Sequence, residues 1–563
     1  MDCSRHSGVD GSGDTQIALS LLLEAHPAKL MKEAVSLKRR SSSQNAVLVG
    51  SGILLSRLVG LVRERIFAHY FGNSDAADAF KAALKIPNLL QNLFGEGALS
   101  SSFIPVYASL LASGKKEEAD RVARIVATIL ALTMSILVLV GVLATPYLID
   151  LIAPGFEGVK RDFTIRMIRI LFPGVGVLVL SAWCLGILNS HRHFFLPYAA
   201  PVLWNLAMIG ALLGFGGTMQ SYPLAKTVAW GSVAGSVLQF GIQLPSAFRL
   251  AGRFHFQFEV VSSNVRTVIR NFIPGIASRG VNQLSSYIDV MLASLLPNTG
   301  AVAALAYAQT IYLLPVSLFG MSVSNAELPE MASQAGSGEP VRSALRQRLD
   351  SAMERVSFFI IPSVAAFLVL GDSIVALLYQ TGKFTPSDVE YVWAVLAGST
   401  VGLLASTLGR LYTSAFWALR DTRTPLRFAT LRVLLTAGLG WLLAFPAPRW
   451  LGLPARMGLV GLTVSAGMAA WIEFTLLRLS LNRKIGRTGL HYPYVAKLWG
   501  IALGAAIPAF ALKYATKGVP PLVSGIAVLF VYGLVFLTSA TALGIPNAVE
   551  LLRAVRSRLS TGS

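Results

Sequence analysis

Apolar stretches of about 20 residues follow one another from Asn45 to Pro546, separated by short polar connections. A hydrocarbon core about 30 Å thick needs roughly 20 apolar helical residues per crossing, so each stretch predicts a membrane-spanning helix. The pattern therefore predicts an all-α integral membrane protein with about 14 transmembrane helices. The expected spans are residues 45–70, 79–112, 122–149, 163–189, 197–216, 223–248, 267–296, 301–333, 353–379, 390–418, 426–446, 457–481, 495–515 and 521–544.

Basic residues gather in every second connection between these spans. Lys115 and Lys116, Arg346 and Arg348, and Arg483 lie in one set of connections, whereas the alternate set holds few lysines and arginines. Because cytoplasmic loops carry the excess of Lys and Arg, this asymmetry predicts that both termini lie in the cytoplasm.

A weak internal repeat divides the chain. The pair Ser56-Arg57 matches Ser278-Arg279, and LFG at residues 93–95 matches LFG at residues 318–320, at nearly the same offset. The repeat predicts two pseudo-symmetric six-helix lobes with a substrate site between them. The predicted parts are a disordered cytoplasmic tail at 1–43, an N-lobe at 44–250, a C-lobe at 251–485, two further helices at 486–546 and a cytoplasmic tail at 547–563.

Composition excludes several functional classes. Hydrophobic residues make up 54% of the chain and charged residues 13%, with a net charge of +20. No basic run is interleaved with aromatic residues, so we expect no nucleic-acid partner. The two cysteines, Cys3 and Cys184, and the spacing of the histidines provide no metal-binding motif, and no phosphate-binding loop is present. We therefore expect no metal, no cofactor and no enzymatic activity.

Charged residues interrupt the first two spans. Arg57 and Glu64, seven positions apart, share one face of the first span, and Arg63 points about 120° away from Arg57. The second span carries a polar stripe that includes Lys85 and Glu96. Charges inside spans usually face a polar interior, although residues near a hairpin tip can also reach the interface. The excess of basic residues predicts a cationic cavity and an anionic substrate.

The predicted C-lobe carries fewer such charges. Arg279 matches Arg57 in the repeat, so two arginines are expected to face each other across a central cleft. Arginine binds phosphate oxygens through two parallel hydrogen bonds. This pair predicts a diphosphate-binding site.

Several segments resemble the MurJ (MviN) family of lipid II flippases, which belongs to the multidrug/oligosaccharidyl-lipid/polysaccharide exporter superfamily. The resemblance is densest in SRLVGLVRE at 56–64, DAF at 78–80, KIPNLL at 85–90 and FGEGA at 94–98. It continues in YQTGKF at 379–384 and DTRTP at 421–425.

The resemblance implies a bacterial inner-membrane flippase that moves lipid II, an undecaprenyl-diphosphate-linked disaccharide-pentapeptide, to the outer leaflet by alternating access. It implies a V-shaped cavity between the lobes and a groove for the lipid tail bordered by the two helices at 486–546. It also implies a monomer, with membrane lipids and cell-wall synthesis proteins as further partners. Combined with the charge pattern, it predicts substrate-binding residues Arg57, Arg63, Asp78, Lys85, Asn88, Glu96 and Arg279. The membrane potential is expected to drive the cycle.

The chain departs from the family pattern at Gln91-Asn92 and Gln309-Thr310, where relatives can carry a basic residue, and Arg279 is a candidate to restore one charge. Arg432 stands in the eleventh span, where a sodium site opposite Asp289 would need a carboxylate, which argues against sodium coupling. The alternatives are an exporter of another polyprenyl-diphosphate-linked saccharide or of a cationic drug, and a non-transporting scaffold for cell-wall synthesis.

Overall fold

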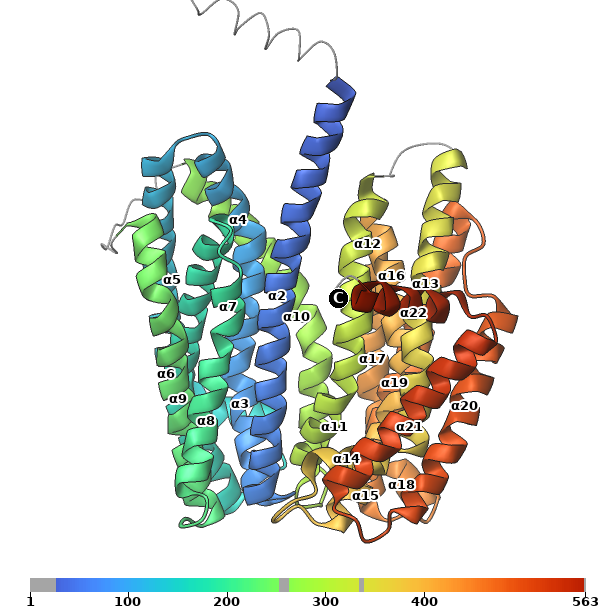
Figure 1. Ribbon diagram of the computed structural model, residues 1–563. Coiled ribbons are helices and arrows are strands. Elements are labelled where there is room, and N and C mark those ends of the chain that lie inside the picture. The colour runs from blue at the N-terminus through green and yellow to red at the C-terminus, as the bar shows by residue number, and fades with distance from the viewer. Residues whose placement is uncertain (1–26, 253–262, 334–338, 561–563) are drawn as a thin grey trace, which may run out of the picture.

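The computed structural model describes residues 27–252, 263–333 and 339–560, and every regular element in these ranges is helical. Within them, side chains are described except at 27–47, 274–282, 325, 329, 332–333 and 554–560. The all-α class predicted from the sequence is confirmed. The helices form two bundles that stand side by side (Figure 1).

The first bundle is called the N-lobe, and α10 runs between the two bundles. On one side α10 contacts α4 and α5, and on the other it contacts α11 and α17. The helices of the N-lobe are α2 (Pro27–Phe71), α3 (Asp75–Phe94), α4 (Glu96–Ala112), α5 (Lys116–Ile152), α6 (Gly158–Ser190), α7 (Phe195–Ala199), α8 (Pro201–Phe215) and α9 (Ser221–Ala251). The helix between the bundles, α10, spans Ser263–Ser294.

The second bundle is called the C-lobe, and two further helices, α20 and α21, pack against its α13 and α14. Its elements are α11 (Ala301–Pro315), the π-helix η1 (Val316–Met321), α12 (Ser322–Ser333), α13 (Glu339–Val369), α14 (Gly371–Tyr379), α15 (Pro386–Thr400), α16 (Leu403–Ala418), α17 (Arg423–Ala444), α18 (Pro446–Trp450), the 3₁₀-helix η2 (Ala455–Met457) and α19 (Gly458–Ile485). The last elements are α20 (Tyr492–Ala515), α21 (Pro521–Ala542) and α22 (Pro546–Ser560).

The structure divides the second expected span into α3 and α4. Gly95 interrupts the helix with φ −80° and ψ −145°. A Cβ at this position would lie 2.3 Å from the carbonyl oxygen of Gln91, so only glycine fits the break. The first turn of α4 then begins with Glu96, whose negative charge favours a helix N-terminus.

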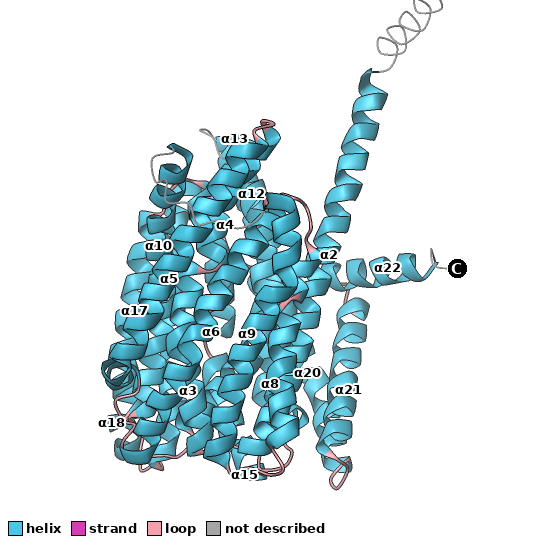
Figure 2. Cartoon of the chain, turned by 90° about the vertical axis from the view of Figure 1, so that its left-hand side faces the viewer, coloured by secondary structure: helices cyan, strands magenta, loops and turns pink. Residues whose placement is uncertain are grey.

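The two ends of the chain differ from the predicted tails. Helix α2 begins at Pro27, inside the tail expected at 1–43, and residues 1–26 lie outside the described residues. The segment from Pro27 is rich in Ala, Leu, Lys and Met, which favour helix, so it continues the first span without interruption. At the other end, α22 occupies most of the expected tail and lies crosswise to α21 (Figure 2).

Ten segments in the described ranges are long and apolar enough to cross a membrane, and each matches an expected span. The other four expected spans correspond to α2, α3 with α4, α9 and α10, which carry more polar side chains. The count of 14 therefore stays a prediction. Large apolar side chains are exposed on the spanning helices, as with Leu143 at 68% and Phe530 at 68%, which suits contact with lipid.

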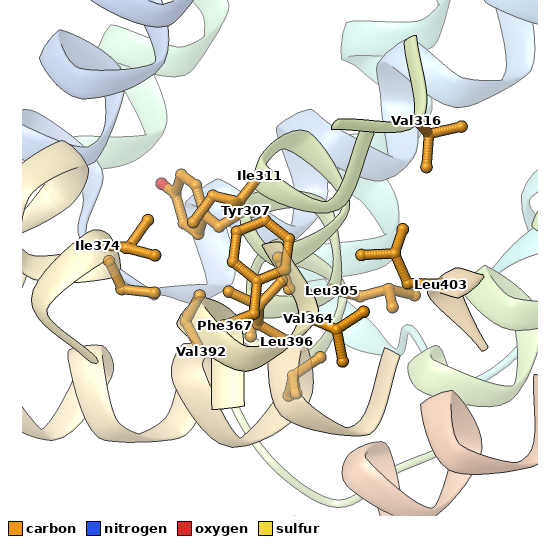
Figure 3. Close-up of a cluster of buried hydrophobic side chains, with 14 of the residues drawn as sticks. Leu305, Tyr307, Ile311, Val316, Val364, Phe367, Ile374, Val392, Leu396 and Leu403 are labelled. Atoms are coloured by element: carbon orange, nitrogen blue, oxygen red, sulfur yellow. The ribbon is translucent and has the colours of Figure 1, made fainter. Parts of the chain in front are cut away.

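A continuous cluster of buried hydrophobic side chains holds the C-lobe helices together. Figure 3 shows Leu305 and Ile311 of α11 beside Phe367 of α13 and Leu396 of α15. All four have exposed fractions of 7% or less. This cluster fixes α11 against α13 and α15 and so positions the polar residues at both ends of α11.

Candidate functional site

A pocket of about 380 Å³, lined by both polar and apolar side chains, lies inside the N-lobe. Arg57 on α2 and Glu96 on α4 both line it, so the structure brings together two of the residues predicted from the sequence. Arg57 is exposed and makes no ion pair or hydrogen bond with another described residue. The other polar lining residues are Ser56, Gln91, Ser181, Tyr198 and Gln239. The pocket therefore presents one exposed guanidinium and one carboxylate beside hydroxyl and amide groups.

Hydrogen bonds hold the far wall of this pocket in place. Gln239 and Gln243 on α9 donate from Nε2 to Ser181 Oγ on α6, at 3.3 Å and 2.7 Å. Asn189 donates to the Tyr198 hydroxyl at 3.2 Å. Because these side chains are already fixed by their neighbours, the wall is organised before any ligand arrives.

Arg63 lies away from this pocket, as its angular separation from Arg57 on α2 predicts. Glu64 has an exposed fraction of 6% and accepts hydrogen bonds from Arg63 and Lys81, both at 2.5 Å. The Arg63 guanidinium also lies 4.9 Å from the ring centroid of Trp204. One carboxylate between two cations leaves this cluster with a single net positive charge.

Asp78 is buried at the end of the bundle where α2 ends. We call this end the outer end, because the charge pattern of the sequence predicts that it faces away from the cytoplasm. Its Oδ1 accepts the Ala303 N–H at 2.7 Å and its Oδ2 accepts the Gly300 N–H at 3.0 Å. Lys160 Nζ lies 2.6 Å from the same carboxylate. Asp78 of the N-lobe thus caps the N-terminus of α11 in the C-lobe, a contact between the two lobes.

The loop between α14 and α15 makes a second contact between the lobes at the outer end. His69 accepts the Lys383 N–H at its carbonyl oxygen at 2.8 Å, and its ring Nδ1 lies 2.8 Å from Thr381 Oγ1. Gly382 has φ +56°, and a Cβ there would lie 2.4 Å from the His69 carbonyl oxygen. We call the contacts of His69 and Asp78 with the C-lobe the outer gate. The YQTGKF motif supplies the C-lobe side of the His69 contacts, and the start of α11 supplies that of the Asp78 contacts.

The remaining predicted residues lie at separate places. Lys85 donates to Ser286 Oγ of α10 at 2.5 Å, and Tyr287 donates from its hydroxyl to the Lys85 carbonyl oxygen at 2.8 Å. Asn88 is half-buried on α3 and does not line the N-lobe pocket. Arg279 belongs to α10, but its side chain lies outside the described residues.

The DTRTP motif joins the start of α17 to the end of α19. Asp421 accepts the Thr424 N–H at 3.0 Å and a bond from Lys484 Nζ at 2.5 Å. Partial burial acts to raise the pKa of Asp421, but the hydrogen bonds from Lys484 and Thr424 outweigh it and hold that pKa below its usual range. The DTRTP motif is therefore explained by the hydrogen bonds with which Asp421 connects the start of α17 to the end of α19.

Several polar residues of the site were not identified from the sequence. Gln239 and Gln243, four apart in an apolar span, were a signal of a polar helix face. In the C-lobe, Arg432 and Glu473 form an ion pair at 3.0 Å, and Arg410 lies near both. Within the described residues, no group of three or more His, Cys, Asp or Glu side chains is placed to hold a metal ion.

Comparisons with known proteins point to one family. The sequence profile described as "Lipid II flippase MurJ" matches residues 67–535. A probable lipid II flippase MurJ of Rhizobium tropici is 32% identical over 78% of this chain and 80% of its own length. The lipid II flippase MurJ of Burkholderia cenocepacia is 31% identical over 80% of this chain and 84% of its own length.

Solved structures show the same fold. "Lipid II flippase MurJ, inward closed conformation" has a TM-score of 0.72 at 23% identity, covering 88% of this chain and 98% of that structure. An inward-facing transporter of the multidrug resistance MATE family has a TM-score of 0.59 at 17% identity, covering 75% of this chain and 95% of that structure.

Proposed function

This chain belongs to the lipid II flippase MurJ family, and from this membership we propose that it carries lipid II from the inner to the outer leaflet of the bacterial inner membrane. It works there as a multi-pass monomer with both termini in the cytoplasm. Surrounding membrane lipids and cell-wall synthesis proteins are its further partners. Transport, rather than catalysis, is its activity.

The single observation that carries this proposal is the exposed guanidinium of Arg57, which has no ion pair or hydrogen bond with any described residue and lies in a pocket inside a membrane protein. A charge held within a membrane protein is costly unless water or a partner compensates it. The diphosphate of lipid II is such a partner, because its oxygens match the two parallel donors of an arginine. The proposed binding set is completed by Glu96, Lys85 and Arg279. Asn88, three positions after Lys85, also belongs to it.

Arg63 and Asp78 have a different part in this proposal. Arg63 already shares Glu64 with Lys81, and Asp78 already accepts two backbone N–H groups and Lys160. We propose that both act by holding the helices around the pocket. We do not place them in direct contact with the substrate, because each already has a full set of protein partners.

Alternating access between the two lobes is the proposed mechanism. The closed outer gate supports it, because the direct contacts of α2 with α14 and of α3 with α11 join the lobes at the outer end. The head group enters from the inner side, the outer gate opens, and the lipid tail stays in the bilayer. Moving negative charge outward across an inside-negative membrane is favoured by about 2.3 kcal/mol per charge per 100 mV, so the membrane potential is the proposed driving force.

The test is transport of lipid II by the purified full-length protein in vesicles. Arg57→Gln should lower the rate roughly tenfold or more, because a charge-assisted hydrogen bond is lost, and Arg57→Lys should retain part of it. Arg449→Gln, an exposed arginine at the outer end, is the control and should transport normally. Full transport by Arg57→Gln would contradict the diphosphate clamp.

The same assay separates the other candidate functions. An exporter of another polyprenyl-diphosphate-linked saccharide would move that lipid faster than lipid II. A non-transporting scaffold would move neither lipid, while depletion of the protein would still disturb wall synthesis in cells.

A further inference from the structure

A polar stripe runs along one face of α16 in the C-lobe. Ser406, Arg410 and Ser414 are spaced four residues apart, so they lie one above another on the helix. Ser406 Oγ lies 2.9 Å from the Tyr312 hydroxyl of α11, and Ser414 Oγ lies 2.8 Å from Ser324 Oγ of α12. These two contacts turn the face that carries Arg410 toward the α11–η1–α12 segment.

Arg410 is therefore level with the π-helical turn η1, because Tyr312 and Ser324 bracket that turn in the sequence. Gly320 of η1 lets α16 approach closely, since a Cβ there would lie 2.5 Å from Thr407 Cγ2. π-helical turns are rare and occur frequently at functional sites. The local geometry thus holds Arg410 against an irregular part of the neighbouring helix.

The charge of Arg410 is not neutralised by any described residue. Its electrostatic neighbours come from three other helices: Tyr312 of α11, Arg432 of α17 and Glu473 of α19. Glu473 is already paired with Arg432 at 3.0 Å, and within the described ranges Arg410 forms no ion pair of its own. Arg432 also lies near Asp289 of α10, whose other charged neighbour is Lys85 of α3. Three cations therefore face two carboxylates, which leaves one positive charge in excess.

The surroundings of Arg410 indicate an interior recess instead of the lipid surface. Its side chain is exposed, and its electrostatic neighbours lie on three other helices of the same lobe, α11, α17 and α19. An unpaired arginine facing acyl chains would be costly, whereas one facing a polar recess remains hydrated until an anion binds. In addition, the Arg432 Nε is buried and has no hydrogen-bond acceptor.

We propose that Arg410, with Arg432 beside it, forms a second oxyanion site that binds a carboxylate of the peptide part of the transported head group. The proposal rests on the proposed function, in which Arg57 in the other lobe binds the diphosphate. Arg57 belongs to the N-lobe and Arg410 to the C-lobe, so the two side chains bind different anionic groups of one substrate. A carboxylate accepts two parallel hydrogen bonds from a guanidinium, and the peptide of lipid II ends in such a group. The head group would then contact both lobes at once.

The experiment compares two head groups in the vesicle transport assay: natural lipid II and lipid II whose peptide carboxylates have been converted to amides. The wild-type protein should move the natural form roughly tenfold faster, the factor expected for one lost charge-assisted hydrogen bond. R410Q should move both forms at the same rate, because the discriminating charge is gone. R410K should retain part of the preference.

Two controls make the outcome specific. Arg449→Gln should keep the full preference, and Arg57→Gln should slow both head groups by a similar factor. If the wild-type protein moves both forms equally, the carboxylate site is refuted without any reference to a variant. If R410Q slows both forms equally, Arg410 binds the diphosphate or supports the fold, and the proposal is also overturned. If the wild-type protein moves neither form, the proposed function itself has failed.

Discussion

The outer gate should open when the carboxylate of Asp78 is replaced by an amide. In Asp78→Asn, one side-chain oxygen can still accept an N–H from the start of α11, but the charge that pairs with Lys160 is lost. Hydrogen bonds to charged groups contribute about 1.5–3 kcal/mol each. Taking about 2 kcal/mol for the loss, the equilibrium between closed and open gate should shift roughly 30-fold toward the open state.

The shift can be measured as access from outside to a cysteine placed under the gate. Ala304 on α11 has an exposed fraction of 0%, so Ala304→Cys should react very slowly with a membrane-impermeant thiol reagent while the gate is closed. Native Cys184 is buried and should contribute little background, and the other native cysteine, Cys3, is replaced by serine in every variant. With Asp78→Asn, the rate of labelling should rise roughly 30-fold, in step with the shift of the gate equilibrium toward the open state.

Asp150→Asn is the matched control. Asp150 forms an ion pair with Arg161 at 2.8 Å, but it is exposed and its partner belongs to the same lobe. Its replacement should leave the labelling rate unchanged, because exposed ion pairs contribute little to stability. Equal labelling in Asp78→Asn and Asp150→Asn would refute the gate. If Asp78→Asn weakened lipid II binding and left labelling unchanged, Asp78 would instead contact the substrate.

Two further predictions concern the loops that join the helices. Gly382→Ala should lower the thermal unfolding temperature and the transport rate more than Gly114→Ala does. Both glycines have positive φ, but only at Gly382 would a Cβ collide with the backbone of His69. Equal effects of the two substitutions would show that the collision is relieved. Asp421→Asn should lower the unfolding temperature at pH 7, and the difference from wild type should begin to shrink below about pH 4 and vanish only at a much lower pH, where the folded carboxylate is protonated. The sign follows from the lowered pKa of Asp421, because its stabilising contribution is present above the unfolded-state pKa and is lost as the folded carboxylate is protonated. A difference that stayed constant from pH 7 down to strongly acidic pH would show that the charge of Asp421 is unimportant.

Much of the helical architecture followed from the sequence. Ten expected spans match helices that are long and apolar enough to cross a membrane. The angular separation of Arg57 and Arg63 also followed from their spacing, and the two side chains lie in different surroundings, one in the N-lobe pocket and one beside Trp204. These features depend on residues within a few turns of one helix, so the local pattern suffices to predict them.

The partners of individual charges did not follow from the sequence. Asp78 was predicted to bind substrate, but its carboxylate meets backbone groups of Gly300 and Ala303, more than 200 positions away. Arg410 drew no prediction at all, because a single arginine in an apolar span has no visible partner in the sequence. Its significance depends on Ser406 and Ser414 meeting two parts of another helix.

The sequence by itself determined where the chain is helical, which helices suit a lipid environment and how charges are distributed around each helix. Helical periodicity and the cost of placing charge in hydrocarbon act over short distances along the chain, so both can be read from it. Only the tertiary structure decided which charges are neutralised and which remain available to a ligand. That outcome depends on which helix ends and faces meet, and their packing is set by contacts between segments far apart in the sequence.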